Sequence, residues 1–309
     1  MKQPVVAVVG PTGVGKTKLS VEIAKRFNGE IISGDSMQIY KGMDIGTAKV
    51  TEEEKQGIPH YMVDIKDPSE TFSVAEFQQL VQGYIDEIAA KGKLPVIVGG
   101  TGLYIQSVLY DFQFSEQQRD QQFVSMLERQ IEEEGIAPLY DKLKKVDPVQ
   151  ADKVHPNNKR RVIRALEVYE KSGLTMTEYQ QQQKQESPYD PILIGLNMDR
   201  EELYTRINRR VDNMIHEGLV NEVNSLYSKG LESAQSLQAI GYKEFLPYIY
   251  GDIPLSEAIE NLKLHSRRYA KRQLTYFRNK LDVNWYIISE ENVNKKFEEI
   301  LDELAGKLP

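Results

Sequence analysis

The sequence predicts an α/β fold, in which helices cover a parallel sheet and a helical domain is inserted into the core. Short apolar runs alternate with stretches of helical periodicity, which is typical of βαβ units. A polar stretch rich in Gln, Glu and Lys interrupts this alternation over residues 115–188. We therefore expect a catalytic α/β core over residues 1–114 and 189–309, with residues 115–188 as a helical insertion that contacts a partner.

The first part of the predicted core alternates strands and helices. Runs that are apolar on both faces predict buried strands, as parallel sheets require, at Val5–Val9, Glu30–Ile32 and Leu94–Val98. Helical spacing predicts helices over Lys18–Phe27 and Ser73–Lys91. Ser73 is a capping residue, and Glu76 three positions later predicts a capping box at the start of the second helix.

The core resumes after the insertion. The apolar run Ile192–Leu196 predicts another buried strand, and Asn284–Ile288 predicts the last one. Helical patterns follow the first of these strands at about residues 200–217, 219–229 and 255–280, and a closing helix is expected after residue 290.

Length and composition limit the classes to which the chain can belong. Its 309 residues, 40% of them apolar, are enough for a large core. The absence of cysteine excludes disulfides and thiolate metal sites. The apolar run near the start is too short for a signal peptide or a membrane span, so we expect a cytoplasmic protein that does not contact a membrane.

The loop after the first strand has the P-loop pattern G-x-x-x-x-G-K-[ST], with a match at every fixed position through Gly10, Pro11, Thr12, Gly13, Val14, Gly15, Lys16 and Thr17. Its glycines allow backbone N–H groups to surround an anion, and the start of the following helix adds a partial positive charge. Lys16 supplies a full charge, and the Thr17 hydroxyl can hold Mg²⁺. The pattern predicts a P-loop NTPase-like core that binds a nucleotide or another phosphorylated ligand, whose identity it leaves open.

Two further loops follow strands and are expected to face the same ligand, because the carboxyl ends of parallel strands share one edge of a sheet. Asp35 follows the second strand, where it could act as a general base; a helix cap or an outer ligand of Mg²⁺ is the alternative. The segment Gly99–Tyr104 closes the third strand, and a simple tight turn into a helix is the alternative there.

Motifs distributed in order along nearly the whole chain resemble those of the tRNA dimethylallyltransferases. Ser33–Lys49 is the longest and most specific of them. The others are the P-loop, Ile58–His60, Gly99–Tyr104, Arg164–Val168, Gly241–Glu244 and Lys271–Thr275. This resemblance implies a reaction in which the exocyclic amine of the adenine 3′ of the tRNA anticodon attacks dimethylallyl diphosphate, and diphosphate leaves.

The resemblance implies catalytic roles for Asp35 as the base, Arg210 as a diphosphate ligand and Thr101 at the site entrance. A base that removes the amine proton as the bond forms contributes about 10²–10⁴-fold. Residues 10–17, with Mg²⁺ on Thr17, would stabilise the charge that grows on the leaving diphosphate. Arg206 lies one turn before Arg210 on the same helix face and would support it; for both, a solvated surface arginine is the alternative.

Two cation-rich stretches predict a tRNA surface. The net charge of −7 taken alone argues against a nucleic-acid partner, but phosphates respond to local charge within about 8–10 Å. The first stretch is Lys159, Arg160 and Arg161 with Arg164, which opens a helix of the insertion. The second is Lys263–Lys280, which holds seven cations and no acid. Interleaved in it are Tyr269, Tyr276 and Phe277, which could stack on the tRNA loop; an ordinary charged helix face is the alternative. We expect the anticodon loop to contact Asp35, Ser36, Met37, Gln38, Thr101, Lys159, Arg160, Arg161, Arg164, Lys271 and Arg272.

Two other functions remain open on the sequence. A P-loop kinase of a small metabolite would use the same phosphate loop, with the insertion as a lid and Asp35 activating a hydroxyl. A non-catalytic nucleic-acid-binding module with a nucleotide switch would bind tRNA or DNA without forming a product. The Ser33–Lys49 match and the basic Lys263–Lys280 helix favour the transferase, which we expect to act as a monomer with Mg²⁺.

Overall fold

The computed structural model describes residues 2–112, 120–182 and 186–308, which fall into two compact units. The first unit comprises residues 1–111 and 187–309, and the second comprises residues 112–186. The boundary expected near residue 115 lies outside the described residues. Each unit has its own core and is described by itself below.

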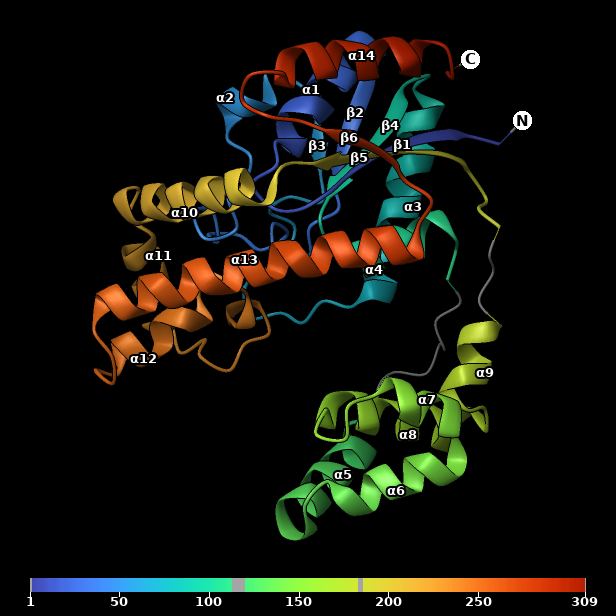
Figure 1. Cartoon of the computed structure of the whole chain (residues 1–309), viewed down its shortest axis with the longest axis vertical. Coiled ribbons are helices and arrows are strands. Elements are labelled where there is room, and N and C mark those ends of the chain that lie inside the picture. The colour runs from blue at the N-terminus through green and yellow to red at the C-terminus, as the bar shows by residue number, and fades with distance from the viewer. Residues whose placement is uncertain (1, 113–119, 183–185, 309) are drawn as a thin grey trace. The chain divides into compact units, whose positions relative to one another are not determined.

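A six-stranded parallel sheet forms the centre of the first unit (Figure 1), in the order β3-β2-β4-β1-β5-β6. The strands are β1 (Pro4–Val9), β2 (Gly29–Ser33), β3 (His60–Tyr61), β4 (Leu94–Gly99), β5 (Asp190–Asn197) and β6 (Asn284–Ile287). Val5–Val9 is completely buried in the centre of the sheet, as its apolar sequence predicts. Strand β3 was not predicted, because two residues are too few to show a periodic pattern.

Helices cover both faces of this sheet (Figure 1). One face packs against α1 (Lys16–Arg26) and α14 (Val293–Ala305), with which Val6 and Val8 share a core cluster. The neighbouring side chains Val5, Ala7 and Val9 point to the other face. That face packs against α3 (Val74–Ala90), α4 (Gly102–Leu109), α10 (Arg200–His216), α11 (Leu219–Tyr227) and α13 (Leu255–Lys280).

Short helices complete the first unit. These are α2 (Glu52–Lys55), α12 (Leu246–Ile249) and the single-turn 3₁₀ segments Ser236–Gln238 and Lys243–Phe245. They lie in connections for which the sequence predicts no element, because a single turn carries too few residues for a helical period.

The second unit is helical in all its described secondary structure. It contains α5 (Gln121–Glu134), α6 (Ala137–Val146), α7 (Pro148–Lys153), α8 (Lys159–Ser172) and α9 (Met176–Gln181). Leu127, Ile131, Leu143 and Leu166 are buried together at its centre. This small separate core explains why so polar a stretch still folds into helices.

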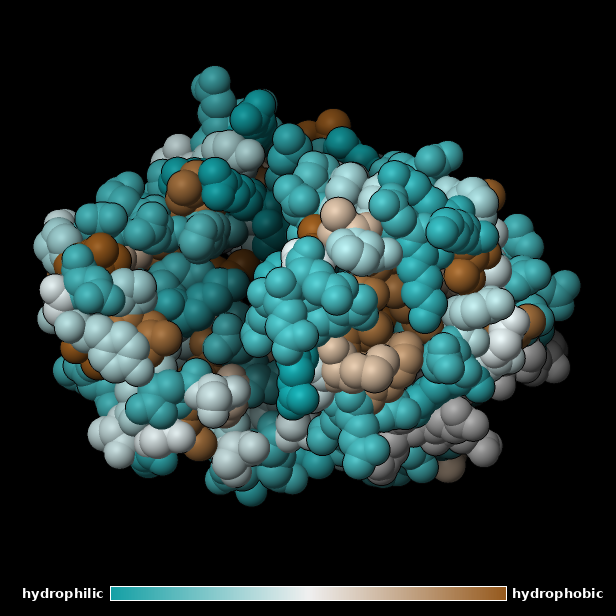
Figure 2. All heavy atoms as spheres, turned by 90° about the horizontal axis from the view of Figure 1, so that it is seen from below, coloured by the Kyte–Doolittle hydropathy of each residue, from teal (hydrophilic) through white to brown (hydrophobic). Residues whose placement is uncertain are grey.

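No helix among the described residues is long and apolar enough to cross a membrane. The face seen in Figure 2 is covered mainly by hydrophilic side chains, with the hydrophobic ones in small groups. A mixed surface of this kind is ordinary for a folded chain.

The start of α3 differs in one detail from its predicted capping box. The Ser73 side chain accepts a hydrogen bond from the Glu76 N–H at 3.1 Å, as expected. The Glu76 carboxylate, however, pairs with Lys66 at 2.8 Å instead of returning to the backbone of Ser73. A charged lysine is a stronger hydrogen-bond partner for a carboxylate than a neutral N–H, so Glu76 pairs with Lys66.

Replacing the cap should therefore cost more than replacing the acid. We expect Ser73→Ala to lower the free energy of unfolding by about 1 kcal/mol, because it leaves an N–H of the first helical turn without a partner. Glu76→Gln should cost no more than a few tenths of a kcal/mol, since its ion pair lies at the surface. Urea unfolding followed by circular dichroism measures both. Equal losses would show that Glu76 contributes as much to the cap as Ser73.

Candidate active site

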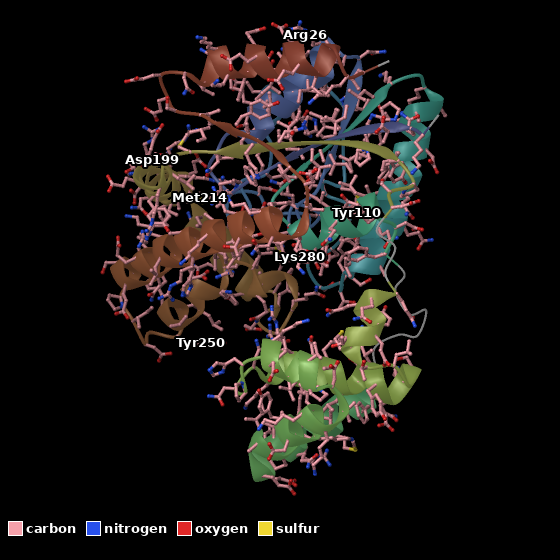
Figure 3. The ribbon with its side chains drawn as sticks, turned by 45° about the vertical axis from the view of Figure 1, so that its right-hand side comes forward. Arg26, Tyr110, Asp199, Met214, Tyr250 and Lys280 are labelled. Atoms are coloured by element: carbon pink, nitrogen blue, oxygen red, sulfur yellow. The ribbon has the colours of Figure 1, made fainter. Side chains whose placement is uncertain are left out.

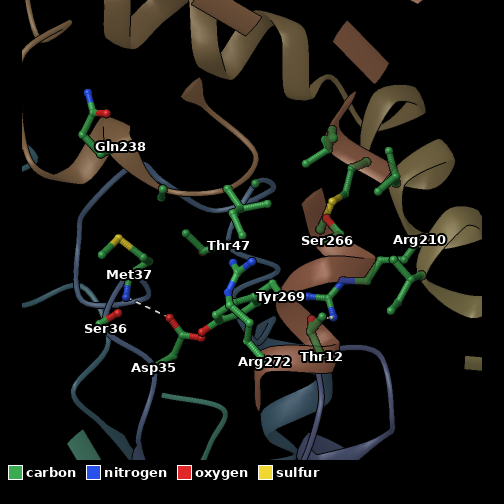
Figure 4. Close-up of a pocket in the computed structure, with 17 residues that line it drawn as sticks. Thr12, Asp35, Ser36, Met37, Thr47, Arg210, Gln238, Ser266, Tyr269 and Arg272 are labelled. Atoms are coloured by element: carbon green, nitrogen blue, oxygen red, sulfur yellow. Dashed lines mark hydrogen bonds between the residues drawn. The ribbon is translucent and has the colours of Figure 1, made fainter. Parts of the chain in front are cut away.

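The loops after β1, β2 and β4 meet at one edge of the sheet, because β4 lies between the other two strands. The backbone N–H of Ser36 donates to Thr101 Oγ1 at 3.3 Å, which joins the loop after β2, here called the second loop, to the loop after β4, here called the third loop. The Asp35 carboxylate accepts from the Met37 N–H at 2.8 Å through Oδ1 (Figure 4). Asp35 and Thr101 are thus neighbours, as the parallel sheet predicts.

The P-loop leads directly into α1. This helix begins at Lys16, two residues earlier than predicted, so Lys16 and Thr17 lie in its first turn, where backbone N–H groups have no helical partner. Lys16 Nζ donates to the Pro11 carbonyl at 2.8 Å and so folds back over the loop. Gly10 lies close to the Leu196 carbonyl, and Val14 is buried in the core beneath the loop.

Two cavities adjoin these loops. The P-loop cavity, of about 550 Å³, is lined by Gly13, Gly15, Lys16, Thr17, Arg206 and Arg209, among others. The Asp35 cavity, of about 260 Å³, is lined by Thr12, Asp35, Ser36, Met37, Tyr269 and Arg272, together with an apolar wall of Ile207, Val211, Ile240 and Leu262. One cavity is therefore rich in anion-binding groups, and the other combines a carboxylate with an apolar surface.

Arg210 and Met214 line both cavities from α10 (Figure 3 marks Met214). The Arg210 guanidinium donates to Thr12 Oγ1 at 3.2 Å, so it is held against the P-loop. Arg206, one turn earlier, lines the P-loop cavity as its helical spacing predicts. The boundary between the two cavities is consequently cationic on one side and apolar on the other.

Burial shifts the charged groups around Arg210. It lowers the pKa of Lys16 to about 7, with a further lowering by Arg210 and an opposing effect of Asp35. Burial also raises the pKa of Asp35, although the N–H of Met37 and the Lys16 charge oppose this shift. Little water therefore reaches these groups to stabilise their charges. An anion that binds there would interact strongly with the cations, because water does not screen them.

Helix α13 packs directly on the third loop, which explains the glycines there. A Cβ on Gly100 would lie 1.9 Å from Gln273 Nε2, and a Cβ on Gly102 would lie 2.2 Å from the Tyr276 ring. Gln273 is 4% exposed, and its Oε1 accepts from the Thr12 N–H at 2.8 Å. The sequence places Gln273 in a motif, but no role was predicted for it; the signal that could have indicated one is a polar residue on the apolar face of a helix.

Tyr269 extends this contact into the Asp35 cavity. Its hydroxyl hydrogen-bonds with Thr101 and Gln273, and burial raises its pKa to about 12, so it stays protonated. The expectation that all three aromatic residues of this helix could stack on a ligand is wrong for Phe277, which is fully buried in the core. Tyr276 is occupied as well, since its hydroxyl donates to Gln106 at 2.6 Å.

The cations of α13 are less available than the sequence predicts. Lys263 pairs with Asp212 at 2.8 Å and with Glu260, and the Arg267 guanidinium donates to Asn208 at 2.6 Å. These partners come partly from α10, which a count of charges along one helix cannot include. Lys271 is exposed, and Arg272 stacks over Tyr269 and lines the Asp35 cavity (Figure 4).

The basic stretch of the second unit opens α8. Lys159, Arg160 and Arg161 are exposed in its first turn, with Asn158 as the cap. Cations are unfavourable there, because the helix dipole places positive charge at the N-terminus. Arg164 differs from them, since it pairs at 2.8 Å with the buried carboxylate of Glu167. The first three are therefore the cations best placed to meet an external anion.

Gln38 lies beside the cavities instead of lining them. Its side-chain oxygen accepts from the Ser33 hydroxyl at 2.9 Å, and its amide donates to the carbonyls of Thr47 and Ala48. Of the second-loop residues expected to contact a ligand, Asp35, Ser36 and Met37 line the Asp35 cavity, whereas Gln38 connects their loop to residues 47 and 48.

A family model described as IPP transferase matches residues 38–280, more than half of the chain. The chain belongs to this family. It is 61% identical over 308 residues to the tRNA dimethylallyltransferase of Oceanobacillus iheyensis, a match that covers 100% of this chain and 98% of that protein. The tRNA dimethylallyltransferase of Bacillus subtilis is 56% identical over 308 residues, covering 99% and 98%.

Solved structures of the family have the same fold. The tRNA isopentenylpyrophosphate transferase of Bacillus halodurans matches with a TM-score of 0.75 and 52% identity, covering 100% of this chain and 97% of that one. A eukaryotic dimethylallyltransferase, described as acting on tRNA, matches with a TM-score of 0.84 and 32% identity, covering 99% and 80%. The predicted P-loop NTPase-like fold is confirmed, and the chain is an enzyme of the prenyltransferase class.

The lowered pKa of Lys16 predicts proton uptake when a diphosphate binds. At pH 8 most of the free protein has a neutral Lys16, because its pKa is about 7, and a bound polyanion would raise that pKa. Titration calorimetry with dimethylallyl diphosphate and EDTA at pH 8, in buffers of different ionisation enthalpy, should report this uptake. Lys16→Met is the control and should take up fewer protons; identical uptake by both proteins would assign the proton to another group.

Proposed function

We propose that this chain transfers the dimethylallyl group from dimethylallyl diphosphate to the exocyclic amine of the adenine 3′ of the tRNA anticodon, releasing diphosphate. The main observation in support of this proposal is that Arg210 lines both cavities. A diphosphate in the P-loop cavity would have its allylic carbon at the boundary, beside the apolar wall of the Asp35 cavity. The adenine amine would approach that carbon from the side of Asp35.

The leaving diphosphate would be held by Lys16, Arg210 and the free N–H groups at the start of α1. Charge grows on its oxygens as the carbon–oxygen bond breaks, and fixed donors stabilise that charge best where water is scarce. Arg210 is already oriented by Thr12, which in turn is held by Gln273. Little reorganisation would be needed at the moment of reaction.

The site also suits Mg²⁺, with Thr17 as its protein ligand. Among the described residues no group of three or more His, Asp or Glu could hold a metal ion. Mg²⁺ bound to phosphates needs few protein ligands and keeps several waters, so a single hydroxyl in the first turn of α1 fits this ion. Bound there, the ion would neutralise charge on the diphosphate.

Asp35 would receive the amine proton as the carbon–nitrogen bond forms. The Met37 N–H fixes one carboxylate oxygen, and Figure 4 shows the other directed toward the part of the cavity near Tyr269 and Arg272. Burial raises the Asp35 pKa, which makes the carboxylate a stronger base than a solvated one. The rate should consequently fall as the pH drops through that raised pKa.

The tRNA would be held by phosphate contacts and by the mouth of the Asp35 cavity. Its adenine must leave the base stack before the amine can be reached. Arg272 at the cavity suits a phosphate next to such a base, and the exposed cations of α8 in the second unit suit other phosphates of the tRNA.

The proposed base predicts how the reaction should fail. We expect Asp35→Asn to lower kcat by about 10²–10⁴-fold with little change in tRNA affinity, because proton transfer is lost and the carboxamide keeps the shape. Mass spectrometry of tRNA after incubation with enzyme, Mg²⁺ and dimethylallyl diphosphate measures the added five-carbon unit. Asp86→Asn, on the exposed side of α3, is the control and should match the wild type.

A wild-type protein that adds no five-carbon unit, and instead transfers phosphate from ATP to a small hydroxyl compound, would replace the proposal with the kinase alternative. A wild-type protein that is active together with a fully active Asp35→Asn would keep the transferase and remove Asp35 as its base.

The exposed cations of α8 predict a salt dependence that net charge conceals. We expect Arg160→Ala with Arg161→Ala to weaken tRNA binding and to reduce the slope of log K against log salt by roughly 0.7–0.9 for each phosphate that is no longer bound. Affinity for dimethylallyl diphosphate should not change. Filter binding over a salt series measures the slopes, with Lys295→Ala and Lys296→Ala on α14 as the control pair. Slopes equal to that of the wild type would identify these arginines as solvated surface residues.

A further inference from the structure

Glu222 makes a set of contacts that the reaction described above does not use. It lies in the first turn of α11 and lines neither cavity. Its Oε2 accepts from the N–H groups of Asp44 and Ile45 at 2.9 and 2.8 Å. Its Oε1 accepts from the Gly46 N–H at 3.0 Å and from the Tyr242 hydroxyl at 2.7 Å. One carboxylate thus binds three successive backbone N–H groups and a buried phenol.

These N–H groups belong to residues 44–48, here named the junction loop, which forms part of the wall of both cavities. Gly46 and Thr47 line the Asp35 cavity. Asp44, Ile45 and Ala48 line the P-loop cavity. The junction loop therefore passes along the boundary where the proposed allylic carbon would lie, on a different element from Arg210.

The contact between Glu222 and the junction loop is closely fitted. A Cβ on Gly46 would lie 2.5 Å from the Tyr242 ring, so the loop backbone lies directly on that ring. Tyr242 is fully buried, and burial followed by the charge of Glu222 raises its pKa, which keeps the hydroxyl protonated as a donor. Among the described residues, no lysine or arginine pairs with Glu222, so its charge is stabilised by N–H and O–H dipoles.

The other side of the junction loop is tied to the proposed base. Gln38 Nε2 donates to the carbonyls of Thr47 and Ala48 at 3.4 and 3.2 Å. Gln38 Oε1 accepts from the Ser33 hydroxyl, which also lies 3.4 Å from the Asp35 N–H. Glu222 is thereby connected through the loop and Gln38 to the segment that carries Asp35.

We propose that Glu222 is a positioning residue for prenyl transfer, which holds the junction loop as a fixed wall between the diphosphate and the base. The inference rests on the proposed function, because it assigns the two cavities to the two substrates. Without the Glu222 carboxylate, the N–H groups of residues 44–46 would lose their acceptor and open to solvent. The junction loop would then move away from the reacting carbon. Misplacement by about 1 Å can cost 10²-fold in rate.

The test compares Glu222→Gln with the wild type. The amide keeps the size of the side chain, but its NH₂ group faces N–H donors and cannot accept from them. We expect amides 44–46 to exchange hydrogen at least about tenfold faster, and kcat/KM for dimethylallyl diphosphate to fall about 10–100-fold. The dissociation constant for tRNA should stay within about twofold of the wild type.

Glu202→Gln is the matched control. This carboxylate on α10 also accepts a distant backbone N–H, that of Glu290 at 2.9 Å, but it lines neither cavity. We expect its loss to change thermal stability without changing kcat or KM. Tyr242→Phe removes one of the four bonds to Glu222 and should lower kcat/KM by a smaller factor, about two- to fivefold. It replaces Glu222→Gln if that variant does not fold.

Unchanged kcat/KM in folded Glu222→Gln, with or without faster exchange of amides 44–46, would overturn the inference and leave Glu222 as a structural residue. An equal fall in kcat/KM in Glu202→Gln would also overturn it, since the effect would then not depend on the junction loop. A wild-type protein without transferase activity would refute the proposed function first, so the two failures are distinguishable.

Discussion

The close approach of α13 to the loops at the carboxyl edge of the sheet is the constraint on which the site depends. Gln273 reaches the Thr12 N–H across the position of Gly100, and Tyr269 reaches Thr101. One helix thus holds the P-loop and the third loop in fixed relation. Thr101 of the third loop in turn holds the second loop, because it accepts a hydrogen bond from the Ser36 N–H. Larger side chains in the third loop would separate the helix from the site.

Within that frame, the chemistry comes from charges that the protein shields from water. Lys16, Arg210 and Asp35 influence one another and are shifted mainly by burial. Arg210 balances the Asp35 carboxylate, and Lys16 adds a second positive charge once a bound anion has raised its pKa, which suits a substrate that brings several negative charges and departs with them. The overall negative charge of the chain therefore says little about this site.

The sequence predicted those parts of the site that depend on local pattern. The phosphate loop, the strands Val5–Val9 and Leu94–Val98, and the meeting of Asp35 with Thr101 follow from motif spacing and from the geometry of parallel sheets. Hydrogen bonds between distant segments were missed: Gln273 with Thr12, 261 residues apart, and Glu222 with Ile45, 177 apart. No local pattern encodes them. The face of α13 was misjudged for the same reason, since only tertiary packing decides that Phe277 is buried.

The start of α8 links ligand occupancy to folding. Three cations in a first turn oppose the helix dipole, each at a cost of about 0.3–1 kcal/mol, and phosphates beside them would remove that cost. By thermodynamic linkage, any polyanion that binds there must also stabilise the helical unit that presents the turn. The second unit is thus more stable with a polyanion bound at this turn than without one, so the polyanion should protect it against proteolysis.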